Sequence, residues 1–241
     1  METKKEMTVN SPMLETLYNA GAHFAFTRSR RHPSAAPFIY GIKNKVEIFD
    51  LQKTLTELAK AKEFIRKYGT EGKTILFVGG KNEARAAVKE VASALNMPYV
   101  FGRWIGGTIT NFTNIRARVE KYLDFVSKRE KGELSKYTKK ERLVIDREIA
   151  KLEEHFSGIL AMKELPKALF VIDSRREKIA VAEAKKAGIP VVSLSGSDND
   201  MKEVNIAIPA NDSSIPSIKL ILSEIATAYR EGKSVKPATV A

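Results

Sequence analysis

Five short segments of this chain are apolar almost throughout and do not alternate between apolar and polar positions. This pattern is typical of parallel strands that are buried on both faces of a sheet. Stretches of helical spacing separate most of these segments, so the chain predicts an α/β fold with right-handed crossovers and helices on both faces of the sheet. The predicted strands are residues 74–78, 98–101, 168–172, 190–194 and 205–208.

The helices between these strands are marked by their capping residues. The predicted helix 82–95 starts at an asparagine, a residue type that caps helices well. Ser174 and Glu177 have the spacing of a capping box, in which each side chain accepts a hydrogen bond from a backbone N–H of the first turn. We expect that helix to end at Gly188, and we expect a last helix over residues 215–230.

The N-terminal part adds smaller elements to this frame. A short helix begins at Pro12, because proline is favoured at the first helical position. Residues 38–41 and 46–49 flank a turn and predict a small hairpin. A helix over residues 51–68 then leads into the first parallel strand.

One connection, between the predicted strands 98–101 and 168–172, spans about seventy residues, far more than an ordinary loop. Apolar residues recur in it at alternating spacings of four and three, the pattern of two helices that share a seam. A capping box of Thr138 and Glu141 starts the second helix. The pattern predicts an antiparallel coiled-coil hairpin. Its seam residues are Ile115, Val119, Tyr122, Val126, Ile145, Ile149, Leu152, Phe156 and Ile159.

These elements divide the chain into three parts. The α/β body is discontinuous and comprises residues 1–111 and 163–231. The helical hairpin, residues 112–162, is inserted into that body, and residues 232–241 are predicted to be a flexible tail.

Charge and composition narrow the range of functions. The chain has 41 Lys and Arg against 29 Asp and Glu, a net charge of +12, which favours a polyanionic partner over a merely basic surface. The absence of cysteine excludes disulfides, a cysteine nucleophile and thiolate metal sites. The three histidines are far apart in sequence, and we expect no metal. No apolar run approaches the ~20 residues of a membrane span and no secretory signal is evident, so we expect a cytoplasmic protein without a membrane partner.

Two stretches concentrate the positive charge. Residues 27–45 hold five Lys and Arg and no acid, in a segment that predicts a loop. Residues 127–142, at the predicted hairpin tip, hold seven Lys and Arg against three Glu. A solvated helix face is the alternative to phosphate binding at the tip. The candidate phosphate-binding residues are Arg28, Arg30, Arg31, Lys43, Lys45, Lys128, Arg129, Lys136, Lys139 and Lys140.

Three further segments follow predicted strands and are candidate ligand sites. Arg103 and Trp104 precede a glycine pair, and they either hold the sheet edge or contact the nucleic acid. The segment 79–81 reads Gly-Gly-Lys but lacks the earlier glycine and the following hydroxyl of a phosphate loop. Asp173 ends a strand, where its carboxylate either stabilises a turn or acts as a catalytic acid or base. We expect no catalytic residue, and a nucleotide-dependent enzyme that uses residues 79–81 and Asp173 stays the alternative.

Several of these segments together resemble one family, the second protein of the small ribosomal subunit in its bacterial form. The resemblance runs from about Met13 to Gly232. It is carried by Arg103-Trp104-Ile105-Gly106-Gly107-Thr108-Ile109-Thr110-Asn111, by the segment from Leu165 through Asp173, Glu177, Glu183-Ala184 and Gly188 to Val191, and by Ile208-Pro209-Ala210-Asn211-Asp212.

The resemblance implies a flavodoxin-like or Rossmann-like sheet with an inserted coiled-coil hairpin. It implies a ribosome-associated structural protein without catalysis or cofactor. Its implied partners are small-subunit ribosomal RNA and neighbouring ribosomal proteins, including the large mRNA-binding protein of that subunit. A third hypothesis is an interaction protein whose hairpin pairs with a partner helix.

The chain departs from the pattern of that family at a few positions. Ala25 and Phe26 stand where glycine and histidine are usual, and Gly196, Ser197 and Asp198 stand at the positions of a common Asp-Thr-Asn. Arginines at 30 and 31 occupy a stretch in which the family commonly has an aromatic residue. We therefore expect phosphate contacts in place of aromatic stacking there.

Overall fold

The computed structural model of the protein describes residues 12–234, except for the side chains of residues 135 and 136. Its centre is a five-stranded parallel sheet in the order β5-β4-β6-β7-β8. Every residue of β4, β6 and β7 is buried, which explains their nearly continuous apolar sequence. The predicted Rossmann-like α/β fold is confirmed. The strands are β4 (Ile75–Gly79), β5 (Tyr99–Phe101), β6 (Ala168–Ile172), β7 (Val191–Ser195) and β8 (Ile206–Pro209).

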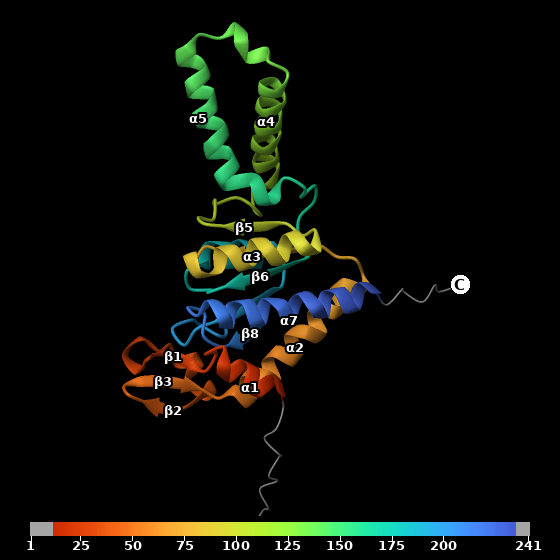
Figure 1. The fold of residues 1–241 in the computed structure, drawn as a ribbon. Coiled ribbons are helices and arrows are strands. Elements are labelled where there is room, and N and C mark those ends of the chain that lie inside the picture. Colours follow the sequence, from red (N-terminus) through yellow and green to blue (C-terminus); the bar gives the residue numbers. More distant parts are fainter. Residues whose placement is uncertain (1–11, 235–241) are drawn as a thin grey trace, which may run out of the picture.

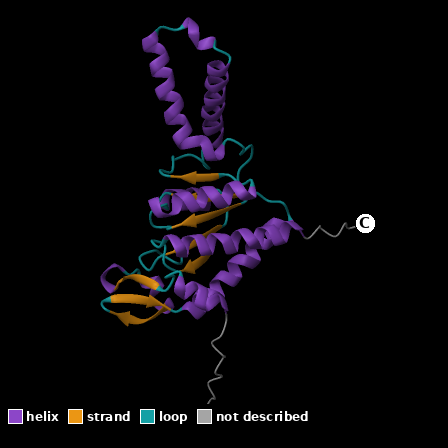
Figure 2. Ribbon diagram, in the orientation of Figure 1, coloured by secondary structure: helices purple, strands orange, loops and turns teal. Residues whose placement is uncertain are grey.

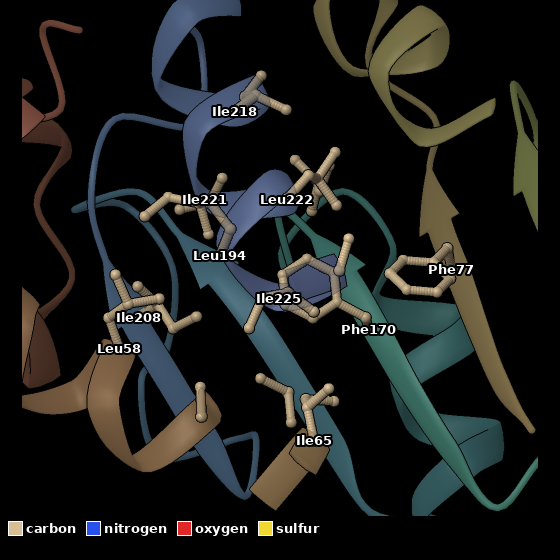
Figure 3. Close-up of a cluster of buried hydrophobic side chains, with 14 of the residues drawn as sticks. Leu58, Ile65, Phe77, Phe170, Leu194, Ile208, Ile218, Ile221, Leu222 and Ile225 are labelled. Atoms are coloured by element: carbon tan, nitrogen blue, oxygen red, sulfur yellow. The ribbon is translucent and has the colours of Figure 1, made fainter. Parts of the chain in front are cut away.

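Alternate residues of the strands belong to two separate hydrophobic clusters. Phe77 and Phe170 pack with Ile225 and its neighbours under α2, α3 and α7 (Figure 3). Leu76 and Val171 belong to the cluster on the other face, under α6 and the bases of two inserted helices. The sheet is therefore a buried layer with helices on both faces, as predicted (Figure 1, Figure 2). The helices are α2 (Leu51–Thr70), α3 (Asn82–Leu95), α6 (Lys178–Lys186) and α7 (Ile215–Ser234).

Helices α2 and α7 cross at two buried glycines. A Cβ atom on Gly69 would collide with the carbonyl oxygen of Tyr229, and one on Gly232 would collide with that of Arg66. The two backbones approach closely there, and α7 is helical to Ser234. Residues 232–234, predicted as part of a flexible tail, are therefore helical, and residues 235–241 of that prediction lie outside the described part of the chain.

The N-terminal elements form a small antiparallel sheet in the order β1-β3-β2 beside helix α1. The predicted hairpin is confirmed, and its two-residue turn places Asn44 and Lys45 at positive φ, as a tight hairpin turn requires. Strand β1 was not predicted, because its side chains lie too near the surface to show a buried pattern. The elements are α1 (Pro12–Asn19), β1 (Phe24–Thr27), β2 (Ile39–Lys43) and β3 (Val46–Phe49).

The long connection forms two helices, α4 (Phe112–Glu130) and α5 (Lys139–Phe156), that project beyond the edge strand β5 (Figure 1). Val119, Ile149 and Phe156 of the predicted seams are buried. The capping box of Thr138 and Glu141 is present at the start of α5, as predicted. A helical insertion is therefore observed, and coiled-coil packing along its whole length stays a prediction.

The other predicted capping box is wrong. Helix α6 begins only at Lys178, and the four residues before it form a turn in which Asp173 Oδ1 accepts a hydrogen bond from Arg176 N. The Glu177 carboxylate instead accepts a hydrogen bond from Gly80 N across the sheet edge. A tertiary partner thus replaces the local one. The predicted stop is correct, since Gly188 follows the helix with a φ of 68°.

Candidate nucleic-acid interface

The loops at the carboxyl ends of the parallel strands surround a buried lysine. Lys81 Nζ lies 2.8 Å from Oδ2 of Asp173 and 2.8 Å from Oδ2 of Asp212. Burial alone lowers the pKa of an ammonium group, but the charge of Asp212 and the hydrogen bonds that Lys81 donates to both carboxylates outweigh it and raise the pKa of Lys81. Lys81 therefore stays charged, with its ammonium already engaged by two acids.

The glycines before this lysine serve packing. A Cβ atom on Gly79 would lie 2.8 Å from Cγ2 of Val88. One on Gly80 would collide with the Glu177 carboxylate and with the carbonyl oxygen of Gly102. The segment 79–81 thus lets the backbone approach its neighbours closely, and this geometry does not favour the phosphate cradle considered in the alternative.

The segment 103–111 is held by one carboxylate from helix α6. Glu183 Oε1 accepts hydrogen bonds from Trp104 Nε1 (3.2 Å) and Gly107 N (2.7 Å). Its Oε2 accepts from the backbone N–H groups of Ile109 (3.0 Å) and Thr110 (3.1 Å) and from the Thr110 hydroxyl (3.2 Å). Two segments about eighty residues apart in sequence are therefore joined by a single side chain.

These hydrogen bonds change the pKa of Glu183, and the burial of Trp104 shows whether its side chain can reach a nucleic acid. Burial alone raises the pKa of a carboxyl, but the donated N–H groups outweigh it and lower the pKa of Glu183. Trp104 is 5% exposed and belongs to a hydrophobic cluster, so it holds the sheet edge and is not accessible to a nucleic acid. Arg103 beside it is exposed.

The N-terminal basic stretch has acidic partners that its sequence lacks. Arg31 Nη1 lies 2.9 Å from Oε1 of the fully buried Glu47. Arg30 Nη2 lies 3.4 Å from Asp198 Oδ2, and its guanidinium lies over the ring of Phe26. Arg31 is consequently a structural residue, whereas Arg28, Lys43 and Lys45 are exposed and form no ion pair within the described chain.

At the other end of the molecule, the hairpin tip carries the second basic stretch (Figure 1). Lys128 Nζ lies 2.6 Å from Asp124 Oδ2, one helical turn away. Arg129, Lys139 and Lys140 are exposed, and the described residues offer them no ion-pair partner. The side chain of Lys136 lies outside the described residues. The fold therefore does not bring the two basic stretches together.

An apolar hollow on the small N-terminal sheet was missed by the sequence analysis. Tyr40 is 81% exposed, and Tyr18, Phe24 and Ile42 beside it are also exposed. The buried ring of His23 lies between Tyr18 and Phe24, and burial together with the charge of Lys43 lowers its pKa. Ile39 and Tyr40 are adjacent apolar residues and so point to opposite faces of β2, which is the signal in the sequence that could have identified this surface.

In the part of the chain that the structure describes, no helix has the length and hydropathy needed to cross a membrane.

Comparison with known proteins agrees with the fold. The ribosomal protein S2 family matches residues 17–232. The small ribosomal subunit protein uS2 of Coprothermobacter proteolyticus is 44% identical over 220 residues, which cover 91% of this chain and 82% of the relative. The uS2 protein of Roseiflexus castenholzii is 41% identical, over 92% of this chain and 84% of the relative. The uS2 protein of Bdellovibrio bacteriovorus is 40% identical, over 91% of this chain and 70% of the relative. These relatives are named as ribosomal proteins and not as enzymes, and this chain belongs to the ribosomal protein S2 family.

Proposed function

We propose that this protein is a structural component of the small ribosomal subunit that binds ribosomal RNA and neighbouring ribosomal proteins. The observation that carries the proposal is exposed, mostly unpaired positive charge on a chain of the ribosomal protein S2 family. Its place of action is the ribosome in the cytoplasm.

RNA is held at the two basic stretches through phosphate contacts and shape. Exposed lysine and arginine release counterions when they meet phosphates, which makes such binding salt-dependent. Arg28, Lys43 and Lys45 at one end and Arg129, Lys139 and Lys140 at the other are the strongest of the predicted residues, because they are exposed without an ion-pair partner in the described chain. Arg31 and Trp104 support the RNA-binding surface from within.

The apolar hollow of Tyr18, Phe24, Tyr40 and Ile42 is suited to a protein neighbour. Exposed aromatic side chains beside one another mark protein contacts more often than contacts with a polyanion. The large mRNA-binding protein of the subunit is the partner proposed for this surface. A second protein contact is favoured at the hairpin, where Leu123, Leu143 and Val144 are exposed.

Sedimentation of cell extract at stepped salt concentrations tests the proposal. We expect the protein to migrate with the small subunit at low salt and to dissociate steeply as the salt concentration rises. Migration as a free protein at low salt would contradict the proposed function.

A further inference from the structure

A rim of arginines that the sequence analysis did not connect lies at the carboxyl edge of the parallel sheet. Three hollows adjoin one another through shared arginines. The middle one shares Arg30 and Arg175 with the hollow on one side and Arg176 with the hollow on the other. Arg103 comes from the loop after β5, and Arg85 comes from the first turns of α3. The residues of this arginine rim are Arg30, Arg85, Arg103, Arg175, Arg176 and Lys178.

Much of the charge on the arginine rim lacks a partner in the protein. Arg85, Arg103 and Arg176 are exposed, and none of them forms an ion pair with a described residue. Like charges gathered without counter-charges repel one another, so their convergence is costly unless an anion joins them. The rim thus has the electrostatics of a site for an anionic partner.

One nearly buried carboxylate positions two further arginines. Asp198 Oδ2 lies 3.4 Å from Arg30 Nη2 and 2.9 Å from Arg175 Nη1. The side chains of Arg30 and Arg175 are nevertheless 56% and 59% exposed. Each guanidinium has five N–H donors in a planar fork, so most donors of both residues remain directed to solvent.

The acids near the rim do not cancel this charge. Lys81 forms ion pairs with Asp173 and Asp212 beneath the surface and offsets one of their two negative charges. Burial raises the pKa of Glu177 to about 7, and its carboxyl group is turned inward to Gly80 N. Asp200 and Glu203 line only the hollow beside Lys178, which leaves the hollows around Arg85, Arg103 and Arg176 positive.

We propose that the arginine rim binds the phosphodiester backbone of ribosomal RNA, as an RNA contact separate from the hairpin tip. The inference rests on the proposed function and extends it to residues of which only Arg30 belongs to a basic stretch. Guanidinium groups bind phosphate oxygens in pairs of parallel hydrogen bonds. Charged side chains line these hollows, and Ile179 is the one large exposed hydrophobic side chain among their described lining residues, so the large apolar centre of a protein interface is missing from this part of the described surface.

Three full-length proteins test the inference by filter binding to purified small-subunit ribosomal RNA over a range of salt concentrations. The first is the wild type, and the second carries Arg85→Gln, Arg103→Gln and Arg176→Gln. The matched control carries Lys67→Gln, Lys186→Gln and Lys233→Gln, exposed cations in the last turns of α2, α6 and α7 that form no ion pair within the described chain. A variant with the same three arginines changed to lysine separates charge from guanidinium geometry.

We expect the Arg→Gln variant to bind at least tenfold more weakly at low salt, and the slope of log K against log salt to fall in magnitude by about two. The control should stay within twofold of the wild type. The Arg→Lys variant should keep most of the slope, because the charge is retained, but should bind several-fold more weakly than the wild type, because lysine cannot make the paired hydrogen bonds of a guanidinium. It serves as the test if the Arg→Gln protein fails to fold, and binding equal to that of the wild type would then contradict the inference.

Several results would overturn the inference while leaving the proposed function intact. One is an Arg→Gln variant that binds RNA as the wild type does. If that variant binds RNA normally but no longer associates with the small subunit, the rim would be assigned to an acidic protein. Saturable ATP binding that requires the rim would assign it to free nucleotides. A wild type that neither binds the RNA nor sediments with the small subunit would contradict the proposed function itself.

Discussion

Two buried glutamates, one just before helix α6 and one within it, show how a few hydrogen bonds decide the protonation state of a residue. Glu183 accepts hydrogen bonds from Trp104 and from three backbone N–H groups, which lower its pKa despite burial. Glu177 accepts one, from Gly80 N, and burial raises its pKa to about 7. The same side chain is therefore ionised at one position and close to half-protonated at the other at neutral pH.

Replacing each glutamate with glutamine should therefore have opposite effects on stability. Glu183→Gln places an amide N–H₂ against N–H donors of Ile109 or Gly107 and should cost about 3 kcal/mol of the free energy of unfolding. Glu177→Gln keeps an oxygen for Gly80 N and removes a charge that burial disfavours, so it should stabilise the protein by roughly 2 kcal/mol at pH 8.

The pH dependence follows from the raised pKa of Glu177. Its folded-state pKa of about 7 exceeds the ordinary 4.5, so the wild type is stabilised below pH 4.5 and loses that contribution as the pH rises through 7. The gain from Glu177→Gln should accordingly shrink between pH 8 and pH 5. Urea unfolding at both pH values measures it, and a gain independent of pH would refute the assignment.

At the scale of elements, the crossing of α2 and α7 depends on the absence of side chains at Gly69 and Gly232. A Cβ atom on Gly232 would lie 2.9 Å from the carbonyl carbon of Arg66 and 3.0 Å from Thr70 N. Backbone atoms cannot rotate away as a side chain can, so the helices would have to separate. The crossing thereby holds the end of α7 against α2.

Gly232→Ala tests this crossing by the sign of its effect. In a helix without tertiary contacts, replacing glycine with alanine stabilises the helix by about 1 kcal/mol, since alanine is the better helix former. At this crossing we expect a loss of roughly 2 kcal/mol, because the helices must part. Gly41→Ala, where a Cβ atom meets nothing within 4 Å, is the control and should change stability little. Thermal unfolding of both variants measures the difference, and a stabilised Gly232→Ala would contradict the crossing.

For the whole molecule, the main feature is the separation of the two basic stretches. The hairpin tip and the small N-terminal sheet lie at opposite ends, with the parallel sheet between them (Figure 1). Changes at sites that share no contacts usually have additive effects. The proposed RNA contacts at the two ends should therefore be separable.

Variants of the two ends, alone and combined, test this separation. One carries Arg28→Gln, Lys43→Gln and Lys45→Gln, and the other carries Arg129→Gln, Lys139→Gln and Lys140→Gln. Each variant should reduce the magnitude of the slope of log K against log salt, measured for subunit binding, by about two. The combined variant should reduce it by the sum of the two single effects. An end whose variant binds as the wild type does has no RNA contact. A combined effect much larger than the sum would mean that the ends are coupled.

The fold class and the family were both predictable from the pattern of residues along the chain. The buried strands are recognisable because a parallel sheet covered on both faces needs apolar residues at successive positions, as in Leu76, Phe77 and Val78. The start of α5 at Thr138 was predictable, because a capping box closes within four residues. The residues that produce such features lie close together in sequence, so a short stretch of the chain is enough to predict them.

The partners of the charged groups, in contrast, became known only from the folded chain. Arg30 and Asp198 are 168 positions apart, and Gly80 and Glu177 are 97 apart, so no window along the chain relates them. Along the sequence, Asp198 is only a departure from the family pattern, and Glu177 is predicted to be part of a capping box. Folding gave each of them a distant partner instead, because a buried carboxylate must find donors wherever the packed chain supplies them.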